Sequence, residues 1–322
     1  MRLGTLTLAA ALVAASCHSA FAASFSSIYT FGDSLSDAGN ASIVTSNAFP
    51  GPGYATRTVP LVPFPVGYYT NPQVGSGPAG LWIDQLAVKL GMADPQPALA
   101  PLGGTNFAIG SADTAAGAAS MSNQVALFLS LTGGAAPSSG LYTFWGGAND
   151  IFDGLNPVAA ADNVANQILA LHAAGANNFL WLNLPSLGKI PDFSGNPAAA
   201  ALANAASAAF DAEYTSRLLA LDSLGINVIG VDVNALFNSI NANPAAFGFT
   251  NITTACMTTA GCNPNSALYW DGAHPTTYTG SLIANLAFQD LTPTPEPPSL
   301  ALLALGSIFT LSLVHARRRE QA

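Results

Sequence analysis

Three polar side chains near opposite ends of the sequence are of the types that together carry out nucleophilic catalysis. Ser34 stands in FGDSLSDAGN, directly after the apolar run of residues 28–31, and Asp271 and His274 stand in WDGAHP. With two residues between them, a carboxylate on a turn can fold back onto the imidazole Nδ1 and leave Nε2 as a base. The simpler alternatives are a Ser or Asp that caps a helix and a solvated His.

Two further segments contain groups suited to stabilising an oxyanion. Asn149, in FWGGAND, follows the apolar run of residues 141–145, and an amide at that place can donate a hydrogen bond without adding charge. Residues 103–112, GGTNFAIGSA, end in small residues that let backbone N–H groups approach a ligand. Asn and Gly are also ordinary turn formers. His172 lies among apolar neighbours in a helical pattern, and we expect it to be structural.

The elements that must position these groups alternate between strand and helix. Apolar β-rich runs cover residues 28–31, 106–109, 141–145, 178–184 and 226–231, and helical patterns cover 81–90, 122–131, 159–174, 197–224 and 278–291. This alternation predicts an α/β fold, a three-layer α/β/α sandwich with a mostly parallel five-stranded sheet. Residues 48–80 are rich in Pro, Gly and Tyr without a period. We expect them to form an ordered loop over the sheet end that binds ligands.

Both ends of the sequence carry export and processing signals. Residues 1–22 combine a positive start, an apolar centre and the small-residue site Ala20-Phe21-Ala22, which predicts a secretory signal peptide. Residues 293–322 combine a Pro-rich linker, sixteen uncharged residues and an Arg-rich end, which predicts a C-terminal membrane signal. A permanent anchor is the alternative, but it needs about 20 residues. One domain, residues 23–292, lies between them.

The composition of residues 23–292 excludes one class of partner. They contain four basic and 15 acidic residues, a net charge of −11. Such a surface repels polyanions, so we exclude nucleic-acid binding. Because only 8% of the whole chain is charged, we also expect the substrate not to be held by ion pairs.

Two cysteines remain after removal of the predicted signal peptide. Cys256 and Cys262 are six residues apart, and in an exported protein such a pair most simply forms a disulfide. Zinc binding is the alternative, but the pair lacks nearby His ligands. We expect the bridge to hold still the loop that precedes Asp271.

Four segments of the chain together resemble the four sequence blocks of the GDSL or SGNH hydrolase family of esterases and lipases. Gly32-Asp33-Ser34-Leu35-Ser36 is similar to the first block, which carries the nucleophile. Residues 106–111, 147–150 and 271–275 are similar to the other three. The resemblance implies a flavodoxin-like fold, a catalytic triad of Ser34, His274 and Asp271, and no metal or cofactor.

The resemblance also implies an oxyanion hole made by the N–H of Ser34, the N–H of Gly110 or Ser111, and the Asn149 amide. One departure from the family pattern lies here. The second block usually ends in Gly-Gly, whereas this sequence has Gly110-Ser111. A serine also offers a backbone N–H, and it adopts the backbone geometry of the glycine without strain provided that the position does not require a positive φ.

We therefore expect an exported serine esterase or lipase that forms an acyl-enzyme on Ser34. Several apolar and aromatic residues in 48–80 favour an apolar acyl group. They are Phe49, Tyr54, Leu61, Val62, Phe64, Tyr68 and Tyr69. The alternatives are a carbohydrate O-acetylesterase acting on acetylated exopolysaccharide, and a non-catalytic surface protein.

The C-terminal tail resembles the PEP-CTERM sorting signal of bacterial exported proteins. The resemblance implies cleavage near residues 295–297 by an exosortase, after signal peptidase has removed the N-terminal segment. The expected location is the periplasm, the cell surface or the medium.

Overall fold

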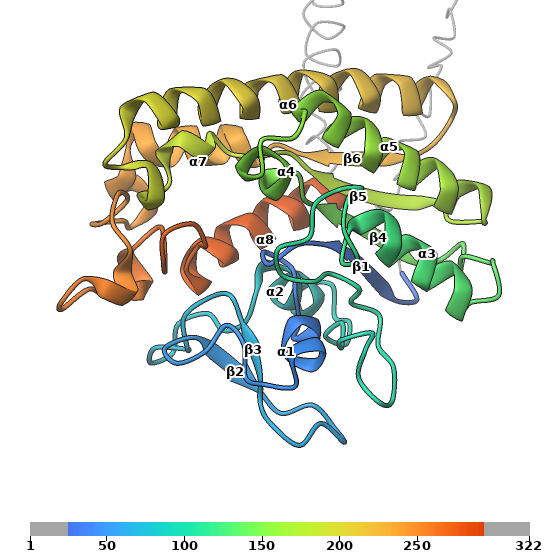
Figure 1. The fold of residues 1–322 in the computed structure, drawn as a ribbon, viewed down its shortest axis with the longest axis horizontal. Helices are drawn as coiled ribbons and strands as arrows, with labels where there is room; N and C mark the ends of the chain where they lie inside the picture. The colour runs from blue at the N-terminus through green and yellow to red at the C-terminus, as the bar shows by residue number, and fades with distance from the viewer. Residues whose placement is uncertain (1–24, 293–322) are drawn as a thin grey trace, which may run out of the picture. The chain divides into compact units, whose positions relative to one another are not determined.

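Four parallel strands form the central sheet of residues 25–292, the part of the chain that the structure, a computed structural model, describes (Figure 1). They are β1 (Ile28–Gly32), β4 (Leu141–Trp145), β5 (Asn178–Leu182) and β6 (Val228–Val231), in the spatial order β1-β4-β5-β6. The predicted signal peptide and sorting tail lie outside the described residues.

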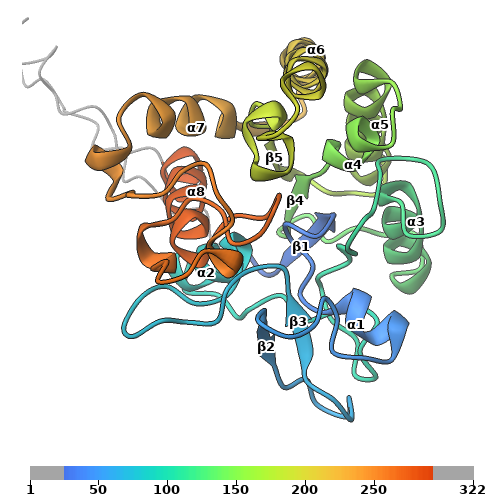
Figure 2. The same cartoon turned by 60° about the vertical axis from the view of Figure 1, so that its left-hand side comes forward.

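Helices cover both faces of this sheet (Figure 2). On one face lie α3 (Met121–Leu131), α5 (Pro157–Ala173) and α6 (Pro197–Ser223), and on the other lie α2 (Trp82–Lys89), α7 (Val233–Ala242) and α8 (Thr277–Leu291). Alternate side chains of β5 enter the two resulting cores, with Trp181 in the first and Leu182 in the second. Burial on both faces explains the nearly continuous apolar strands, and the predicted three-layer α/β/α fold is confirmed.

The fifth predicted strand, residues 106–109, is not a regular strand. Its backbone does follow β1, since Phe107 N–H donates to the Thr30 carbonyl at 2.7 Å and Ile109 N–H donates to that of Gly32 at 3.2 Å. However, the Asn106 side chain accepts the N–H of Ala108, and only a single bridge to Thr30 forms. A side chain that bonds its own backbone competes with the ladder, and the regular sheet stops at four strands.

Short polar sequences start the long helices. Asn156 precedes Pro157, and its side chain accepts the N–H of Val158 at 2.9 Å at the start of α5. The pair Asn196-Pro197 starts α6 in the same way, since Asn196 accepts the N–H of Ala199 at 3.1 Å. Asn or Asp before a first-turn Pro is a strong start signal, because proline lacks the N–H that the first turn leaves unpaired.

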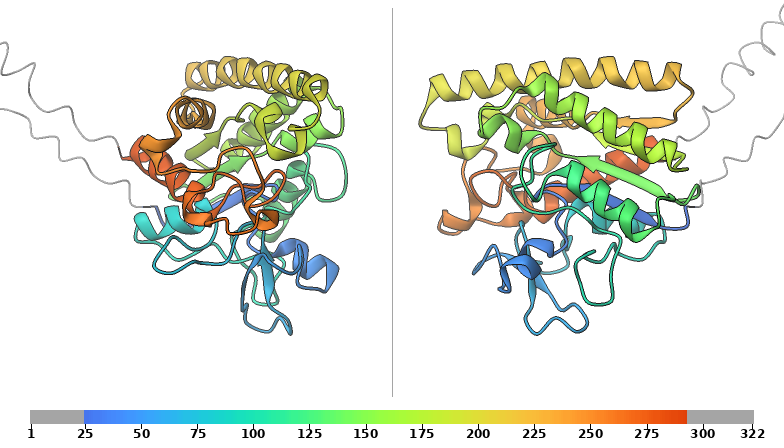
Figure 3. Two further views of the ribbon diagram at one scale, coloured as in Figure 1. Left: turned by 90° about the vertical axis from the view of Figure 1, so that its left-hand side faces the viewer. Right: turned by 45° about the vertical axis from the view of Figure 1, so that its right-hand side comes forward.

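The region predicted as a long loop contains a small antiparallel hairpin. β2 (Ala55–Arg57) pairs with β3 (Val66–Tyr68) and lies on the opposite side of the sheet from α6 (Figure 3). Two short helices, α1 (Asn40–Thr45) and α4 (Ala148–Phe152), start after β1 and β4 respectively.

Among residues 25–292, no helix is both long and apolar enough for a membrane span.

Candidate active site

The end of β1 holds Ser34 on a tight turn. Gln124, from α3, pairs with both backbone groups of Gly32, accepting its N–H at 2.9 Å and donating to its carbonyl at 2.8 Å. A Cβ atom at Gly32 would overlap the carbonyl oxygen of Trp145, on the neighbouring strand β4. Glycine is therefore required here for close packing of the two strand ends, and the chain turns directly into Ser34.

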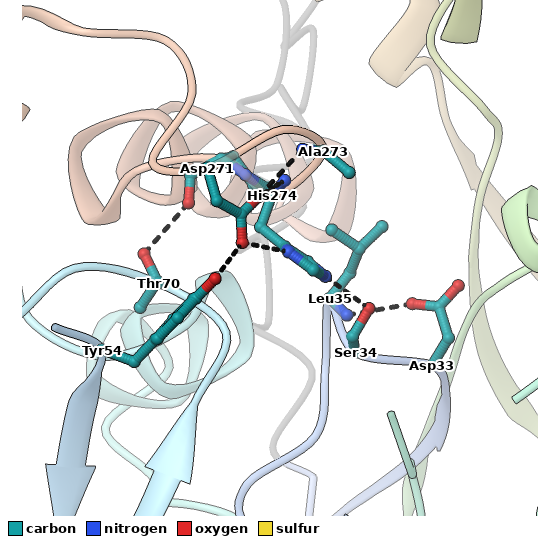
Figure 4. Close-up of polar contacts among 9 residues, drawn as sticks. Asp33, Ser34, Leu35, Tyr54, Thr70, Asp271, Ala273 and His274 are labelled. Carbon is teal, nitrogen blue, oxygen red and sulfur yellow. Dashed lines mark hydrogen bonds and ion pairs between the residues drawn. The ribbon is translucent and has the colours of Figure 1, made fainter. Parts of the chain in front are cut away.

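Ser34, His274 and Asp271 lie in one hydrogen-bonded row (Figure 4). Ser34 Oγ is 2.8 Å from His274 Nε2, and His274 Nδ1 is 2.7 Å from Asp271 Oδ2. Ser34 is only 9% exposed, which limits the approach of bulk water to the hydroxyl. This is the arrangement in which an imidazole can take the serine proton while a carboxylate orients the ring.

The Asp271 carboxylate is surrounded by donors. Its Oδ1 accepts the backbone N–H groups of Ala273 at 2.8 Å and His274 at 2.7 Å, and its Oδ2 accepts the hydroxyl of Tyr54 at 2.6 Å. Burial raises the pKa of Asp271, but the hydrogen bonds and charge of His274, together with Tyr54, outweigh it and hold the pKa well below its usual range. The carboxylate therefore stays ionised at any pH at which an imidazole can serve as a base.

Asp33, next to the nucleophile, has the opposite electrostatics. It is 1% exposed, and burial raises its pKa to about 7, against the opposing effects of the Leu35 N–H and of His274. The Leu35 N–H donates to Asp33 Oδ1 at 2.9 Å, which closes the turn around Ser34. Asp33 therefore supports the turn, and near neutral pH its charge is only partly formed.

Two of the expected oxyanion donors line the pocket beside Ser34. Asn149 Nδ2 donates one hydrogen to the carbonyl of Ala112 at 2.8 Å, which fixes the amide and leaves its second hydrogen for a ligand. Ser111 lines the same pocket with φ at +63°, in the left-handed region. The position does require a positive φ, which costs a serine about 1–2 kcal/mol more than a glycine.

Gly110, the other candidate donor in this segment, has a different partner. Its N–H donates to Asp37 Oδ2 at 2.8 Å, so that N–H is not available to an oxyanion. The buried carboxylate also accepts the N–H groups of Gly39 at 2.7 Å, Asn40 at 2.6 Å and Ala41 at 3.0 Å. A Cβ atom at Gly110 would overlap the Tyr69 hydroxyl. Gly110 is therefore a packing residue, and within this pair only Ser111 remains as a donor.

A pocket of about 230 Å³ opens beside Ser34 and His274. Apolar side chains from β4, α4, α7 and the segments after β5 and before α8 form most of its wall, with the acidic Asp192 also on its lining. The apolar residues are Leu35, Trp145, Ala148, Phe152, Leu184, Pro185, Leu187, Ile190, Phe237, Tyr269, Ala273 and Pro275.

The apolar residues of 48–80, from which we predicted an apolar acyl group, contribute little to this wall. Of that group only Tyr69 lines the pocket. Phe49 and Leu61 are exposed, and Tyr68 packs in the core formed with α2 and α8. The residues of this wall could not be predicted, because they come from five segments that are far apart in the chain and contain no recognisable motif. Apolar residues at the carboxyl end of a strand, such as Leu184 after β5, were the available signal.

The disulfide-closed segment and the β2–β3 hairpin both hold the loop that carries Asp271 and His274. Cys256 and Cys262 form a disulfide, and in the segment it closes the N–H groups of Cys256 and Met257 donate to the carbonyls of Tyr269 at 3.1 Å and Trp270 at 2.8 Å. From the other side, Thr70 at the end of the β2–β3 hairpin donates to the Pro275 carbonyl at 3.0 Å.

The remaining predicted features concern His172 and metals. His172 lies on α5 with Nδ1 3.0 Å from the carbonyl oxygen of Ala176, in a local helix-end contact. Within residues 25–292, no three His, Cys, Asp or Glu side chains gather in a way that could hold a metal ion.

Comparison with known proteins identifies the family. The sequence model of the GDSL-like lipase/acylhydrolase family matches residues 28–287. Esterase EstA of Pseudomonas aeruginosa is 29% identical over 335 residues, covering 88% of this chain and 49% of EstA. Lipase 1 of Photorhabdus luminescens is 24% identical over 370 residues, covering 92% of this chain and 51% of that lipase. The chain thus spans about half the length of these two relatives.

Solved structures resemble the chain more distantly. A member of the lipolytic protein G-D-S-L family from Veillonella parvula is 12% identical with a TM-score of 0.45, covering 83% of this chain and 99% of that one. The sequence match alone extends over nearly all of the described residues. The chain therefore belongs to the GDSL-like lipase/acylhydrolase family, a family of carboxylic ester hydrolases.

Proposed function

We propose that this protein is an exported serine esterase or lipase that hydrolyses esters of apolar carboxylic acids through an acyl-enzyme on Ser34. The observation that carries the proposal is the row Ser34–His274–Asp271, with contacts of 2.8 and 2.7 Å, at the edge of an apolar pocket. Family membership supports ester hydrolysis in general.

Acylation follows from the positions of the three side chains. Ser34 Oγ forms a bond to the ester carbonyl carbon while its proton passes to His274 Nε2, and the carbonyl π electrons move onto the oxygen. Asp271 stabilises the resulting imidazolium through Nδ1. The oxyanion is bound by the N–H of Ser34, the N–H of Ser111 and the free hydrogen of the Asn149 amide.

Collapse of this intermediate breaks the bond to the alcohol oxygen, which takes the proton from His274 Nε2. A water molecule then gives a proton to Nε2 as its oxygen attacks the acyl carbon. The second tetrahedral intermediate releases the carboxylic acid and returns the proton to Ser34 Oγ. Each proton is moved by His274, so one base serves both halves of the reaction.

The lining of the pocket favours an acyl chain over an acetyl group. Side chains such as Trp145, Leu187 and Phe237 offer no hydrogen-bond acceptor for sugar hydroxyls, and they gain free energy by burying methylene groups, about 0.8 kcal/mol for each. An acetyl group would leave most of this wall unused. We therefore place carbohydrate O-acetyl esters second to esters of longer acids.

The test is a set of initial rates for the purified protein and a Ser34→Ala variant. The substrates are p-nitrophenyl esters from acetyl to palmitoyl and an acetylated polysaccharide. We expect rates that rise with acyl length beyond acetyl and then fall when the chain no longer fits the pocket. Removal of the nucleophile should lower kcat by on the order of 10⁴–10⁶-fold.

Two results would count against the proposal. Equal rates for the folded wild-type protein and Ser34→Ala on every ester would remove the catalytic role. Activity on the polysaccharide and p-nitrophenyl acetate alone would instead select the acetylesterase alternative.

We also propose that signal peptidase cleaves after Ala22 and that an exosortase cleaves near residues 295–297. The supporting observations are the sequences of the two ends. Mass spectrometry of the protein recovered from periplasm, membrane and medium would give both mature termini. A product that retained residues 1–22 or the Arg-rich end in every fraction would contradict the proposal.

A further inference from the structure

We propose that Tyr54 is a positioning residue for the triad, acting through Asp271 to set the orientation and basicity of His274. This inference rests on the proposed function of Ser34, His274 and Asp271. The Tyr54 hydroxyl donates to Asp271 Oδ2 at 2.6 Å, and this is the oxygen that lies 2.7 Å from His274 Nδ1 (Figure 4). The four side chains therefore form one continuous row from phenol to nucleophile.

The hairpin fixes the phenol in this place. Tyr54 directly precedes β2, and the next residue, Ala55, pairs with Tyr68 and donates its N–H to the Thr70 carbonyl at 2.8 Å. The Tyr69 ring lies 5.0 Å from the imidazole of His274, and Thr70 donates to the Pro275 carbonyl. Three residues of one hairpin thus contact the loop of residues 271–275 at successive points. Such a clamp positions a side chain more accurately than a free loop does.

The phenol also stays a donor throughout the neutral range. Burial raises the pKa of Tyr54, and the hydrogen bond to Asp271 and the charges of Asp271 and Asp192 raise it further. A donor on Oδ2 draws negative charge away from the imidazole, because the carboxylate shares that charge between two partners. Without the hydroxyl, Asp271 would hold the imidazolium more strongly and make His274 harder to deprotonate.

Other charged or titratable groups face the same row and remain in any Tyr54 variant. They are Asp33 from the end of β1, Tyr69 from the end of β3 and Asp192 from the segment after β5. A change limited to the Tyr54 hydroxyl leaves all three in place. A shift in the pH dependence can therefore be assigned to the phenol.

The kinetic experiment compares Tyr54→Phe with the wild-type protein and with Tyr142→Phe. Tyr142 is a matched control, since its hydroxyl also makes one hydrogen bond, to the Pro137 carbonyl at 2.8 Å near the start of β4. For Tyr54→Phe we expect kcat about tenfold lower, KM within about twofold, and the acidic limb of kcat/KM shifted about half a unit to higher pH. For Tyr142→Phe we expect neither change in activity.

A second measurement does not depend on turnover. The NMR titration of the His274 imidazole protons should have its midpoint at higher pH in Tyr54→Phe, while His172, on α5, serves as an internal reference. Replacing Tyr54 with 3,5-difluorotyrosine, whose phenol is a stronger donor, should move the midpoint the other way. Tyr54 carries out no proton transfer in this proposal, so activity should be reduced and not abolished.

The results distinguish a failure of the proposed esterase function from a failure of the positioning role of Tyr54. If the wild-type protein hydrolyses no ester but the His274 midpoint moves in opposite directions in the two Tyr54 proteins, the proposed function fails and the positioning contact stands. If the midpoint and the acidic limb match the wild-type values in both proteins, the positioning role is wrong. A lower kcat in Tyr54→Phe at all pH values, with an unmoved limb, would reduce Tyr54 to a structural residue.

Discussion

The two sides of the pocket are built in different ways. The nucleophile side comes from the ends of two neighbouring parallel strands, and its polar groups are held by backbone contacts and by the buried carboxylates of Asp33 and Asp37. The acid–base side is an irregular loop, residues 269–275, held by a disulfide-closed segment and by side chains of the β2–β3 hairpin.

The two sides of the pocket therefore depend on different contacts. Strand ends are rigid because the ladder and both cores fix them, so Ser34 needs few dedicated partners. A loop has no ladder, and its catalytic groups must be fixed by individual hydrogen bonds from elsewhere in the chain. Changes on the acid–base side should therefore act mainly on turnover, and the changes that alter stability should lie mainly on the nucleophile side.

The largest effect is expected from Asp271→Asn, on the acid–base side. An amide cannot stabilise the imidazolium, and it favours the wrong tautomer of His274, so kcat should fall about 10⁴-fold. Asp222→Asn, at the exposed end of α6, serves as a control and should keep wild-type kcat. A loss below about tenfold, with the fold intact by circular dichroism, would contradict the role assigned to Asp271.

The next effect is expected from Asn149→Ala, on the nucleophile side. Loss of one oxyanion donor should lower kcat by about 10²–10³-fold with little change in KM. Asn149→Asp keeps the shape but places a carboxylate beside the developing negative charge, so its kcat should be lower still. Wild-type kcat in the alanine variant would exclude the amide from the oxyanion hole.

A smaller effect is expected on the pH dependence of protein stability, through the buried carboxyls of the nucleophile side. Burial raises the pKa of Asp33 to about 7 and that of Asp37 to about 6, so between pH 4 and 7 the folded state binds more protons than the unfolded state. Stability should therefore fall as the pH rises through this window. Thermal melts at constant ionic strength should give a Tm about 5 °C higher at pH 5 than at pH 8.

The same melts on Asp33→Asn should show a weaker pH dependence, because one of the buried carboxyls with a raised pKa no longer titrates; Asp84 and Asp211, whose pKa values burial raises to about 6 and about 7, keep their share. The pKa of Asp271 is lowered in the folded state, so its contribution to stability is lost only when the pH falls below the ordinary pKa of an aspartate, which lies outside this window. A Tm that rises from pH 5 to pH 8 would show that these carboxyls are not buried as described.

The smallest effect is expected from Ser111→Gly. Glycine adopts a φ of +63° without the steric cost of a Cβ atom, about 1–2 kcal/mol, but it also gains conformational freedom in the unfolded chain. The variant should therefore gain a net of about 0.5–1 kcal/mol in the free energy of unfolding, measured by denaturant titration. The N–H is retained, and kcat should stay within about twofold. Ser111→Ala keeps both the N–H and the strain, and it should show no gain in stability.

The long helices, the regular strands and the candidate site residues could be predicted from the sequence. Long periodic segments such as α5 and α6 matched their predicted ranges to within two residues at each end. The β2–β3 hairpin was not foreseen, because strands of three residues have no visible period. Helix α7, which supplies Phe237 to the pocket, was missed because its Asn-rich sequence has low helix propensity.

The choice of oxyanion donor between Gly110 and Ser111 was also beyond the sequence. It depends on Asp37, 73 residues away from Gly110 in the chain, whose buried carboxylate takes the Gly110 N–H. The hydrogen bond of Tyr54 to Asp271 spans 217 residues and has no local signal either. Contacts of this kind are set by tertiary packing, which local pattern does not encode.

The separation of the two sides along the chain has a consequence for synthesis. Ser34 and His274 are 240 residues apart, and His274 lies just before α8, the last helix of the described residues. A growing chain made from its N-terminus therefore carries Ser34 through the synthesis of the next 240 residues without the base that would activate it. A chain that has not yet reached His274 therefore lacks the group that, in the proposed mechanism, would let Ser34 react with an ester.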